Sequence, residues 1–113
     1  MSEAITLELD RPRAIKFRYP ELKEIQRTIG KPFGTILQDL AQLDIQQIET
    51  LLFIGLRGED RTLRRERLEE LLTAFYEREG TVRDVLYVLN EALIASGFLG
   101  RPGSGAAPPA PST

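Results

Sequence analysis

The side chains that could perform acid–base or nucleophilic chemistry are few. Two adjacent carboxylate pairs occur, Glu59-Asp60 and Glu69-Glu70, whereas acid–base catalysis needs two carboxyl groups with separated pKa values in a pocket. One pair falls in a polar loop and the other on a charged helix face, so we interpret both as solvated surface. The chain has no histidine, which excludes a Ser-His-Asp arrangement. We therefore expect no catalytic residue and no enzyme activity.

Metal and phosphate sites are equally poorly supported. The chain has neither cysteine nor histidine, the commonest zinc ligands. The segment GEDRTLRRE at 58–66 superficially resembles a calcium loop but lacks the ligand spacing D-x-[DN]-x-[DN]-G. The segment GKPFG at 30–34 is no phosphate-binding loop, because its lysine precedes the second glycine and no GK[ST] follows. We expect no metal and no cofactor.

Charge gives little support for a nucleic acid partner. Four arginines form a local basic cluster: Arg61, Arg64, Arg65 and Arg67. Glutamates at 66, 69 and 70 interleave with them, and the net charge of the chain is −2. Nucleic-acid-binding proteins usually carry a basic excess in a continuous stripe. We interpret the cluster as a solvated face and expect no nucleic acid partner.

The compartment follows from what the sequence lacks. The N-terminal MSEAITLELD has no basic and then apolar signal pattern. The longest apolar run, Leu51 to Leu56, is far shorter than the roughly 20 residues that cross a bilayer. The absence of cysteine is compatible with a reducing cytosol. We expect a soluble protein that stays in the cell that makes it and has no membrane partner.

An N-terminal hairpin is predicted from alternating side chains. Residues 5–10 and 15–19 both alternate between apolar and polar, which is the pattern of a half-buried strand. The apolar positions are Ile5, Leu7, Leu9, Ile15, Phe17 and Tyr19. Arg11-Pro12-Arg13 suits the turn. The polar positions are acidic in the first strand and basic in the second, so cross-strand pairing favours an antiparallel hairpin.

Five helices are predicted to cover the hairpin, at about 20–29, 35–43, 45–57, 63–79 and 82–96. Their boundaries rest on Pro20 as a start, glycines at 30, 80 and 97 as stops, Asp44 as an N-cap, and Thr81 with Asp84 as a capping box. The helix at 45–57 is apolar almost all round near its end, which indicates a central, buried helix. Gly55 inside it is expected to permit a close helix contact.

The fold class is therefore α+β and mostly helical, with an antiparallel β-hairpin packed on a bundle of about five helices. The chain of 113 residues fits one domain, which we place at 1–100. Residues 101–113, RPGSGAAPPAPST, carry almost no charge or bulk, so a flexible, disordered tail is predicted there.

A partner-binding surface is predicted on the last helix. Its core-facing stripe centres near Leu89, and at about 100° per residue Tyr87 and Ile94 lie roughly 130° away. Phe98 continues that direction if the last turn extends. Such a second apolar stripe marks a partner site. The alternative is that the hairpin or the helix at 63–79 covers it. Phe75 and Tyr76 are the second candidates.

The order of these features resembles the tail assembly chaperones of long-tailed bacteriophages (siphoviruses) and gene transfer agents. A charged hairpin, ITLELDRPRAIKFRY, leads into a helix that ends in Ile29-Gly30-Lys31. The most telling stretch is Leu51 through Leu72, in which LLFIGLRGED joins a buried helix to TLRRERLEELL. The resemblance covers about residues 5–96. The arginine-rich start at 61–67 departs from the more acidic helix start that the family implies.

The resemblance implies a chaperone for the tape measure protein, a long apolar helical protein that sets tail length. Such a chaperone shields its client, recruits tail tube protein, and acts in the host cytoplasm without entering the mature virion. In many relatives a ribosomal frameshift near the end of the frame makes a longer form, and the tail at 101–113 would suit that junction. The alternatives are a structural tail or head-tail connector protein and a small bacterial adaptor protein.

Overall fold

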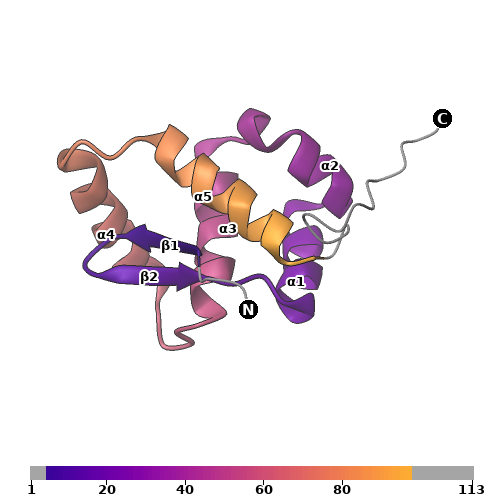
Figure 1. Cartoon of the computed structure of the whole chain (residues 1–113), viewed down its shortest axis with the longest axis horizontal. Coiled ribbons are helices and arrows are strands. Elements are labelled where there is room, and N and C mark those ends of the chain that lie inside the picture. Colours follow the sequence, from indigo (N-terminus) through magenta and orange to yellow (C-terminus); the bar gives the residue numbers. More distant parts are fainter. Residues whose placement is uncertain (1–4, 98–113) are drawn as a thin grey trace.

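The computed structural model describes residues 5–97, in which a two-stranded antiparallel hairpin is followed by helices (Figure 1). The elements are β1 (Ile5–Glu8), β2 (Pro12–Ile15), α1 (Tyr19–Ile29), α2 (Phe33–Gln38), the 3₁₀ helix η1 (Leu40–Gln42), α3 (Ile45–Arg57), α4 (Arg65–Glu77) and α5 (Val82–Ala95). The predicted fold class, α+β and mostly helical with an N-terminal hairpin, is confirmed. The predicted tail at 101–113 lies outside the described residues.

The hairpin is shorter than expected, and its turn lies earlier. The strands pair in the register Ile5↔Ile15 through Glu8↔Pro12, so Pro12 opens β2 instead of forming the turn. Proline is tolerated at the first residue of a strand because its missing N–H is not needed there. The expected pairing of acidic with basic side chains across the strands is wrong, since Glu8 faces Pro12 and Lys16 follows β2.

The segment after β2 also differs from expectation. Tyr19 was predicted to continue the strand, but it begins α1 and is 64% exposed. Pro20 in the first turn and the Glu21 carboxylate, which accepts the backbone N–H of Arg18 at 2.8 Å, start the helix there. The basic side chains of this segment pair elsewhere, Lys16 with Glu59 at 4.0 Å and Arg18 with Glu21 at 3.5 Å.

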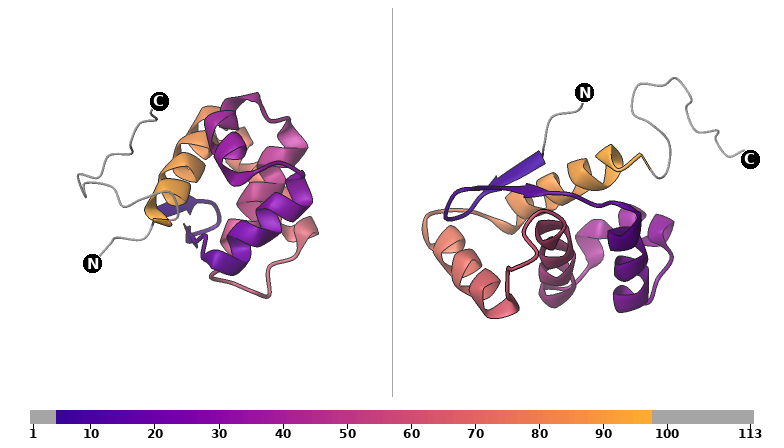
Figure 2. Two further views of the ribbon diagram at one scale, coloured as in Figure 1. Left: turned by 90° about the vertical axis from the view of Figure 1, so that its right-hand side faces the viewer. Right: turned by 90° about the horizontal axis from the view of Figure 1, so that it is seen from below.

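The molecule has two layers. The hairpin and α5 lie along one side, and α4, α3 and α1 lie side by side along the other (Figure 2). Helix α3 is central, because it contacts β2, α1 and α5. Its start is fixed by Asp44, whose carboxylate accepts the Gln47 backbone N–H at 2.8 Å, as predicted. The apolar second half of α3 is buried at Leu51, Leu52, Ile54 and Leu56, which confirms the central position expected from the sequence.

Gly55 permits a close approach, although the partner is a strand and not a helix. Its carbonyl accepts the backbone N–H of Lys16 at 3.0 Å. A Cβ at Gly55 would lie 2.6 Å from a methyl carbon of Ile15 and 2.8 Å from the Phe17 ring. The end of β2 therefore crosses directly over the last turns of α3, where a side chain at position 55 would hold it away.

Other helix ends depart from prediction at specific residues. The single helix expected at 35–43 is α2 and η1, separated at Asp39. Helix α4 begins two residues late and ends at Glu77, and Glu79 instead of Gly80 adopts a left-handed φ of 73°. Gly80 packs against the Phe75 ring. Within residues 5–97, no helix has both the length and the apolar character that crossing a membrane requires.

Candidate partner-binding surfaces

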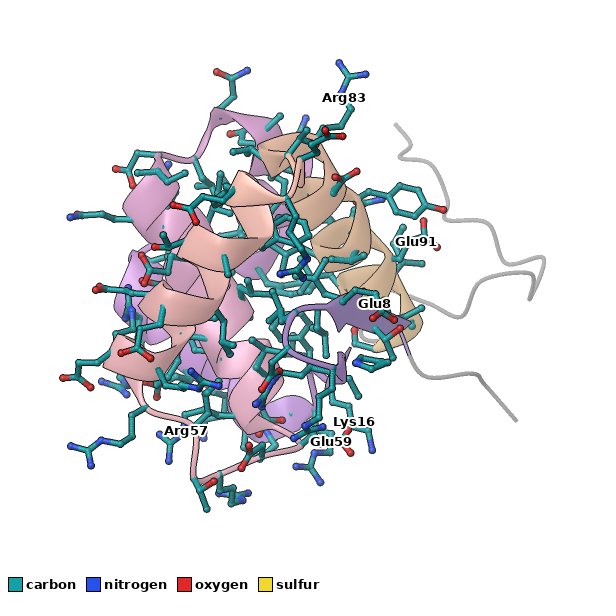
Figure 3. All side chains as sticks on the ribbon, turned by 90° about the vertical axis from the view of Figure 1, so that its left-hand side faces the viewer. Glu8, Lys16, Arg57, Glu59, Arg83 and Glu91 are labelled. Carbon is teal, nitrogen blue, oxygen red and sulfur yellow. The ribbon has the colours of Figure 1, made fainter. Side chains whose placement is uncertain are left out.

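The outer face of α5 carries two exposed apolar side chains, Tyr87 at 65% and Ile94 at 40% exposure. They are seven residues apart and so point the same way, two turns from each other. Asn90 and Glu91 lie between them and are half-buried, and Arg83 lies one turn before Tyr87. Figure 3 shows Arg83 and Glu91 along this side of the molecule. The predicted stripe is thus exposed, but it is mixed apolar and polar.

The inner face of α5 explains why these side chains point outward. Val85, Leu89, Ala92 and Leu93 are buried against β1, β2 and α3. Thr81 caps the helix by accepting the Asp84 backbone N–H at 3.1 Å, and the Asp84 carboxylate accepts the Thr81 N–H at 3.0 Å, which confirms the predicted capping box. The hairpin packs on α5 but leaves Tyr87 and Ile94 uncovered within the described residues.

The other predicted partner residues have different positions. Phe75 is 8% exposed and belongs to the core, so it presents little surface to a partner. It faces inward because α4 packs its Leu68, Leu71, Leu72 and Phe75 side against the core. Tyr76 is half-buried and meets the Phe75 ring edge-on at 5.3 Å between centroids. Phe98 lies outside the described residues.

Tyr76 borders a hollow of about 290 Å³ between α3, α4 and the start of α5. Its lining is apolar except for two carboxylates and two hydroxyl groups: Ile45, Ile48, Glu49, Leu52, Glu69, Leu72, Thr73, Tyr76 and Val85. Burial, and secondarily the charge of Glu49, raise the pKa of the Tyr76 hydroxyl, so it stays a neutral donor. At the edge of the hollow Ile45 is 56% exposed. An apolar side chain of a partner could enter here.

Sequence reasoning missed Ile45 as a surface residue. It lies seven positions before Leu52, on the same face of α3, so its periodicity is that of a core residue. The apolar periodicity of α3 predicts which side of the helix faces the core. It does not predict how much of that side the neighbouring helix covers. Ile45 is the first residue of α3, and more than half of its side chain is exposed at the hollow between α3 and α4.

The arginine cluster is largely neutralised within the fold. Arg67 approaches Glu70 at 3.2 Å and Asp10 at 3.5 Å, and Arg65 approaches Glu49 at 3.2 Å. Arg64 meets Glu66 at 4.0 Å with both side chains more than 80% exposed. Arg61 has no carboxylate partner within residues 5–97. These contacts form no continuous basic stripe.

The carboxylate pair at 59–60 is not simply solvated surface, because Asp60 helps to hold a buried arginine. Arg13 donates to Asp10 through Nε at 2.7 Å and Nη2 at 2.9 Å, and to Asp60 through Nη1 at 3.2 Å. Its side chain is 10% exposed. The Arg13 hydrogen bond holds the pKa of Asp10 well below its usual range. The Thr62 hydroxyl, with smaller help from Arg13, lowers the pKa of Asp60.

This network joins the hairpin turn to the loop between α3 and α4, and we assign it a structural role. Both carboxylates are committed to the same guanidinium. Among the described residues, no cluster of three or more acidic side chains could hold a metal ion. Figure 3 shows Lys16 and Glu59 near this end of the molecule, where a further ion pair links the segment after β2 to the same loop.

Comparison of this chain with protein-family models, with curated proteins and with solved structures found no match. A function is therefore proposed from its own residues and surfaces.

Proposed function

We propose that this protein is a tail assembly chaperone of a long-tailed bacteriophage or gene transfer agent, which binds and shields the tape measure protein and helps to recruit tail tube subunits. The observation that carries the proposal is the exposure of Tyr87 and Ile94 on one side of α5. The order of elements over residues 5–96, and above all the stretch from Leu51 to Leu72, supports it by resemblance.

The outer face of α5 suits a partner that is held and then released. A client helix laid along α5 would cover Tyr87 and Ile94 with its own apolar face, which is the helix-to-helix form of recognition. Fully burying one large apolar side chain contributes roughly 1.5–3 kcal/mol before the costs of association. Two such contacts beside Asn90 and Glu91 give a reversible contact instead of a permanent interface.

The hollow between α3 and α4 is the second place for the client. Ile45 and Tyr76 border it, and Ile48, Leu52 and Leu72 line its apolar floor. A single bulky apolar side chain entering the hollow would remove Ile45 from water. In this proposal the protein acts in the host cytoplasm and is absent from the mature virion, and a frameshifted longer form of the chain would share both surfaces.

The test is co-purification with the tape measure protein, taken from the very long helical reading frame expected next to this gene. We expect Tyr87→Asp with Ile94→Asp to abolish co-purification while the melting temperature stays within a few degrees, because both positions are exposed. The matched control is Gln42→Asp with Gln46→Asp, which adds the same charge at exposed positions elsewhere. If the folded Tyr87/Ile94 variant still co-purified with the tape measure protein as well as the unmodified chain does, these two residues would not form the binding site.

Mass spectrometry of purified particles tests the role itself. A chaperone should be absent from particles and present in lysates of producing cells. Recovery of the chain in particles at a fixed ratio to tube subunits would instead identify a structural tail or connector protein. Neighbouring reading frames without a tube protein or a long helical protein would favour an adaptor.

A further inference from the structure

A second concave surface lies between α1, α3 and the loop that leads to α4, with a volume of about 330 Å³. Its lining combines apolar, acidic and basic side chains: Pro20, Glu21, Glu24, Thr28, Thr50, Phe53, Ile54, Arg57, Arg61 and Arg65. We call it the arginine groove. It does not include any residue of the proposed client surface.

Phe53 is half-buried in this groove and orders the arginines around it. The guanidinium carbons of Arg57 and Arg65 lie 5.6 Å and 5.4 Å from the centre of the Phe53 ring, within the range of cation–π attraction. Arg57 also donates through Nη2 to the carbonyl of Arg61 at 2.9 Å. A guanidinium held in this way has less side-chain entropy to lose when it binds a ligand.

The charges in the groove are unevenly matched. Arg65 is paired with Glu49 at 3.2 Å and also donates to the Thr50 hydroxyl at 3.0 Å. Arg57 and Arg61 have no carboxylate partner within residues 5–97. Two positive charges, one of them ordered against Phe53, therefore remain open to a ligand.

The acidic wall of the groove does not neutralise these two arginines. Glu21 accepts the Arg18 backbone N–H at 2.8 Å and lies 3.5 Å from its guanidinium. Glu24 pairs with Arg27. Both carboxylates are therefore paired with side chains around α1, on the opposite wall from Arg57.

We propose that the arginine groove binds a protein segment that presents a carboxylate side chain next to an apolar one. The planar guanidinium matches a carboxylate through two parallel hydrogen bonds, and Arg57 and Arg61 supply the charge. Phe53, Ile54 and Pro20 provide apolar surface for the neighbouring side chain. The site goes beyond the proposed chaperone function and does not depend on it.

The lining of the groove favours a protein carboxylate over nucleic acid. Glu21 and Glu24 face the same space, and their charge opposes a phosphate chain more than a single carboxylate. A nucleic acid also needs a continuous basic track, whereas the neighbouring arginines are paired with Glu49, Glu66 and Glu70. We therefore expect the partner to contact the groove through a single carboxylate and not through an extended run of negative charges.

The groove is separate from the outer face of α5. Figure 3 shows Arg57 and Glu91 toward opposite sides of the molecule. An acidic partner at the arginine groove and an apolar client at α5 could therefore be held at the same time. Substitutions at the two places should act independently.

The test uses the full chain and an alanine-based helical peptide with two leucines, each followed three residues later by glutamate. Binding is followed by chemical-shift changes of the Arg57 and Arg61 Nε–H groups and the Phe53 amide. We expect the glutamate peptide to bind about tenfold more tightly than the same peptide with glutamine, the effect of one good charge-assisted contact. A thymidine oligonucleotide serves as the nucleic acid probe.

Arg61→Gln and Arg64→Gln form a matched pair of variants. Each removes one charge from an exposed arginine of the same loop region, but only Arg61 of the two lines the groove. We expect Arg61→Gln to weaken the glutamate peptide about tenfold and Arg64→Gln to change it less than twofold. The Arg61 side chain donates no hydrogen bond within residues 5–97, so its variant should fold normally.

Three results would overturn the proposal. The first is the absence of shift changes at Arg57, Arg61 and Phe53 up to millimolar peptide. The second is equal binding of the glutamate and glutamine peptides, or equal effects of the two variants. The third is tighter binding of the oligonucleotide than of the peptide through the same two arginines, which would assign the groove to nucleic acid.

Discussion

Arg13 is a buried cation whose position depends on two carboxylates from different parts of the chain. Asp10 lies in the hairpin turn, and Asp60 lies in the loop after α3, 47 positions after Arg13. Removing one partner of a buried ion pair is costly because it leaves an uncompensated charge. The network therefore holds the hairpin turn against the loop after α3.

Acid should weaken the fold through this network. The folded-state pKa of Asp10 is lowered from an ordinary value of 3.8, mainly by the Arg13 hydrogen bond. A lowered pKa contributes stability that is complete above the ordinary value and is lost as the pH falls below it toward the folded-state pKa. We expect Asp10→Asn to destabilise the protein near pH 7 and to flatten the loss of unfolding free energy below about pH 4.

Urea unfolding between pH 7 and pH 2 measures this effect, with Asp39→Asn as the control. Asp39 is exposed, and its carboxylate forms no hydrogen bond or ion pair within residues 5–97. An Asp10→Asn variant with the same pH dependence as the unmodified chain would show that Asp10 is not responsible.

Arg13 also shows where single-residue prediction from sequence stops. The Arg-Pro-Arg stretch predicts a turn because proline fixes φ, yet Arg13, Ile15 and Phe17 are all buried. Extending the alternation backwards would have placed Arg13 inward. The sequence offered no sign of Asp60 as its partner, because nothing local links positions so far apart.

At the scale of elements, the crossing of β2 over α3 is the tightest contact that the structure describes for a glycine in a helix. A Cβ at Gly55 would lie 2.6 Å from Ile15 and 2.8 Å from Phe17, whereas a Cβ at Gly34 in α2 would meet no atom within 4 Å. Both glycines are helical, so they share the same cost in helix propensity.

Replacing each of these glycines by alanine should give opposite results. We expect Gly55→Ala to lower the free energy of unfolding by about 1–3 kcal/mol, because overpacking outweighs the gain in helix propensity. Gly34→Ala should raise it by about 0.4–1 kcal/mol, since no atom is displaced. Chemical denaturation of the two variants measures both, and a neutral or stabilising Gly55→Ala would contradict the crossing.

The ends of a helix could be predicted closely where a capping residue or a continuous apolar pattern marks them in the sequence. Helix α3 begins and ends at the predicted residues, because Asp44 caps it and its apolar positions continue to the end. The helix expected at 35–43 is interrupted at Asp39, which no glycine or proline marks. The charges on the two strands led to a wrong prediction of which residues pair across the hairpin. The register of a hairpin is set instead by its turn and by the burial of its apolar side.

At the scale of the whole molecule, the hairpin is tied to the far end of the helical layer by Arg78. Its Nη2 donates to the carbonyls of Glu8 at 3.0 Å and Leu9 at 2.7 Å. An isolated two-stranded hairpin is marginally stable in water. Such distant hydrogen bonds, together with burial on α3 and α5, are what hold it.

Arg78→Ala should loosen the hairpin selectively. Loss of about 1 kcal/mol of local stability corresponds to about fivefold faster amide hydrogen exchange. We expect this acceleration in β1 and β2 and unchanged exchange in α1, with Arg83→Ala as the exposed arginine control. Uniform acceleration throughout the protein would mean that Arg78 stabilises the entire fold instead of one part of it.

The candidate surfaces could be predicted in part at this scale. Tyr87 and Ile94 were found because helical geometry places them away from the core stripe, and they are exposed. The burial of Phe75 was not expected: adjacent helical residues point about 100° apart, and the sequence does not say that the core covers Phe75 more fully than Tyr76. The arginine groove could not be predicted, since it needs the three-dimensional neighbourhood of Phe53.

The ties of the hairpin also have a consequence for biosynthesis. A ribosome makes β1 and β2 before the helices that follow, and their hydrogen-bonding partners Asp60 and Arg78 come 47 to 70 positions later. Until α5, the helix that packs on β1, has left the exit tunnel, the apolar side of β1 lacks its cover, so the hairpin must be among the last parts of the described fold to reach its native position.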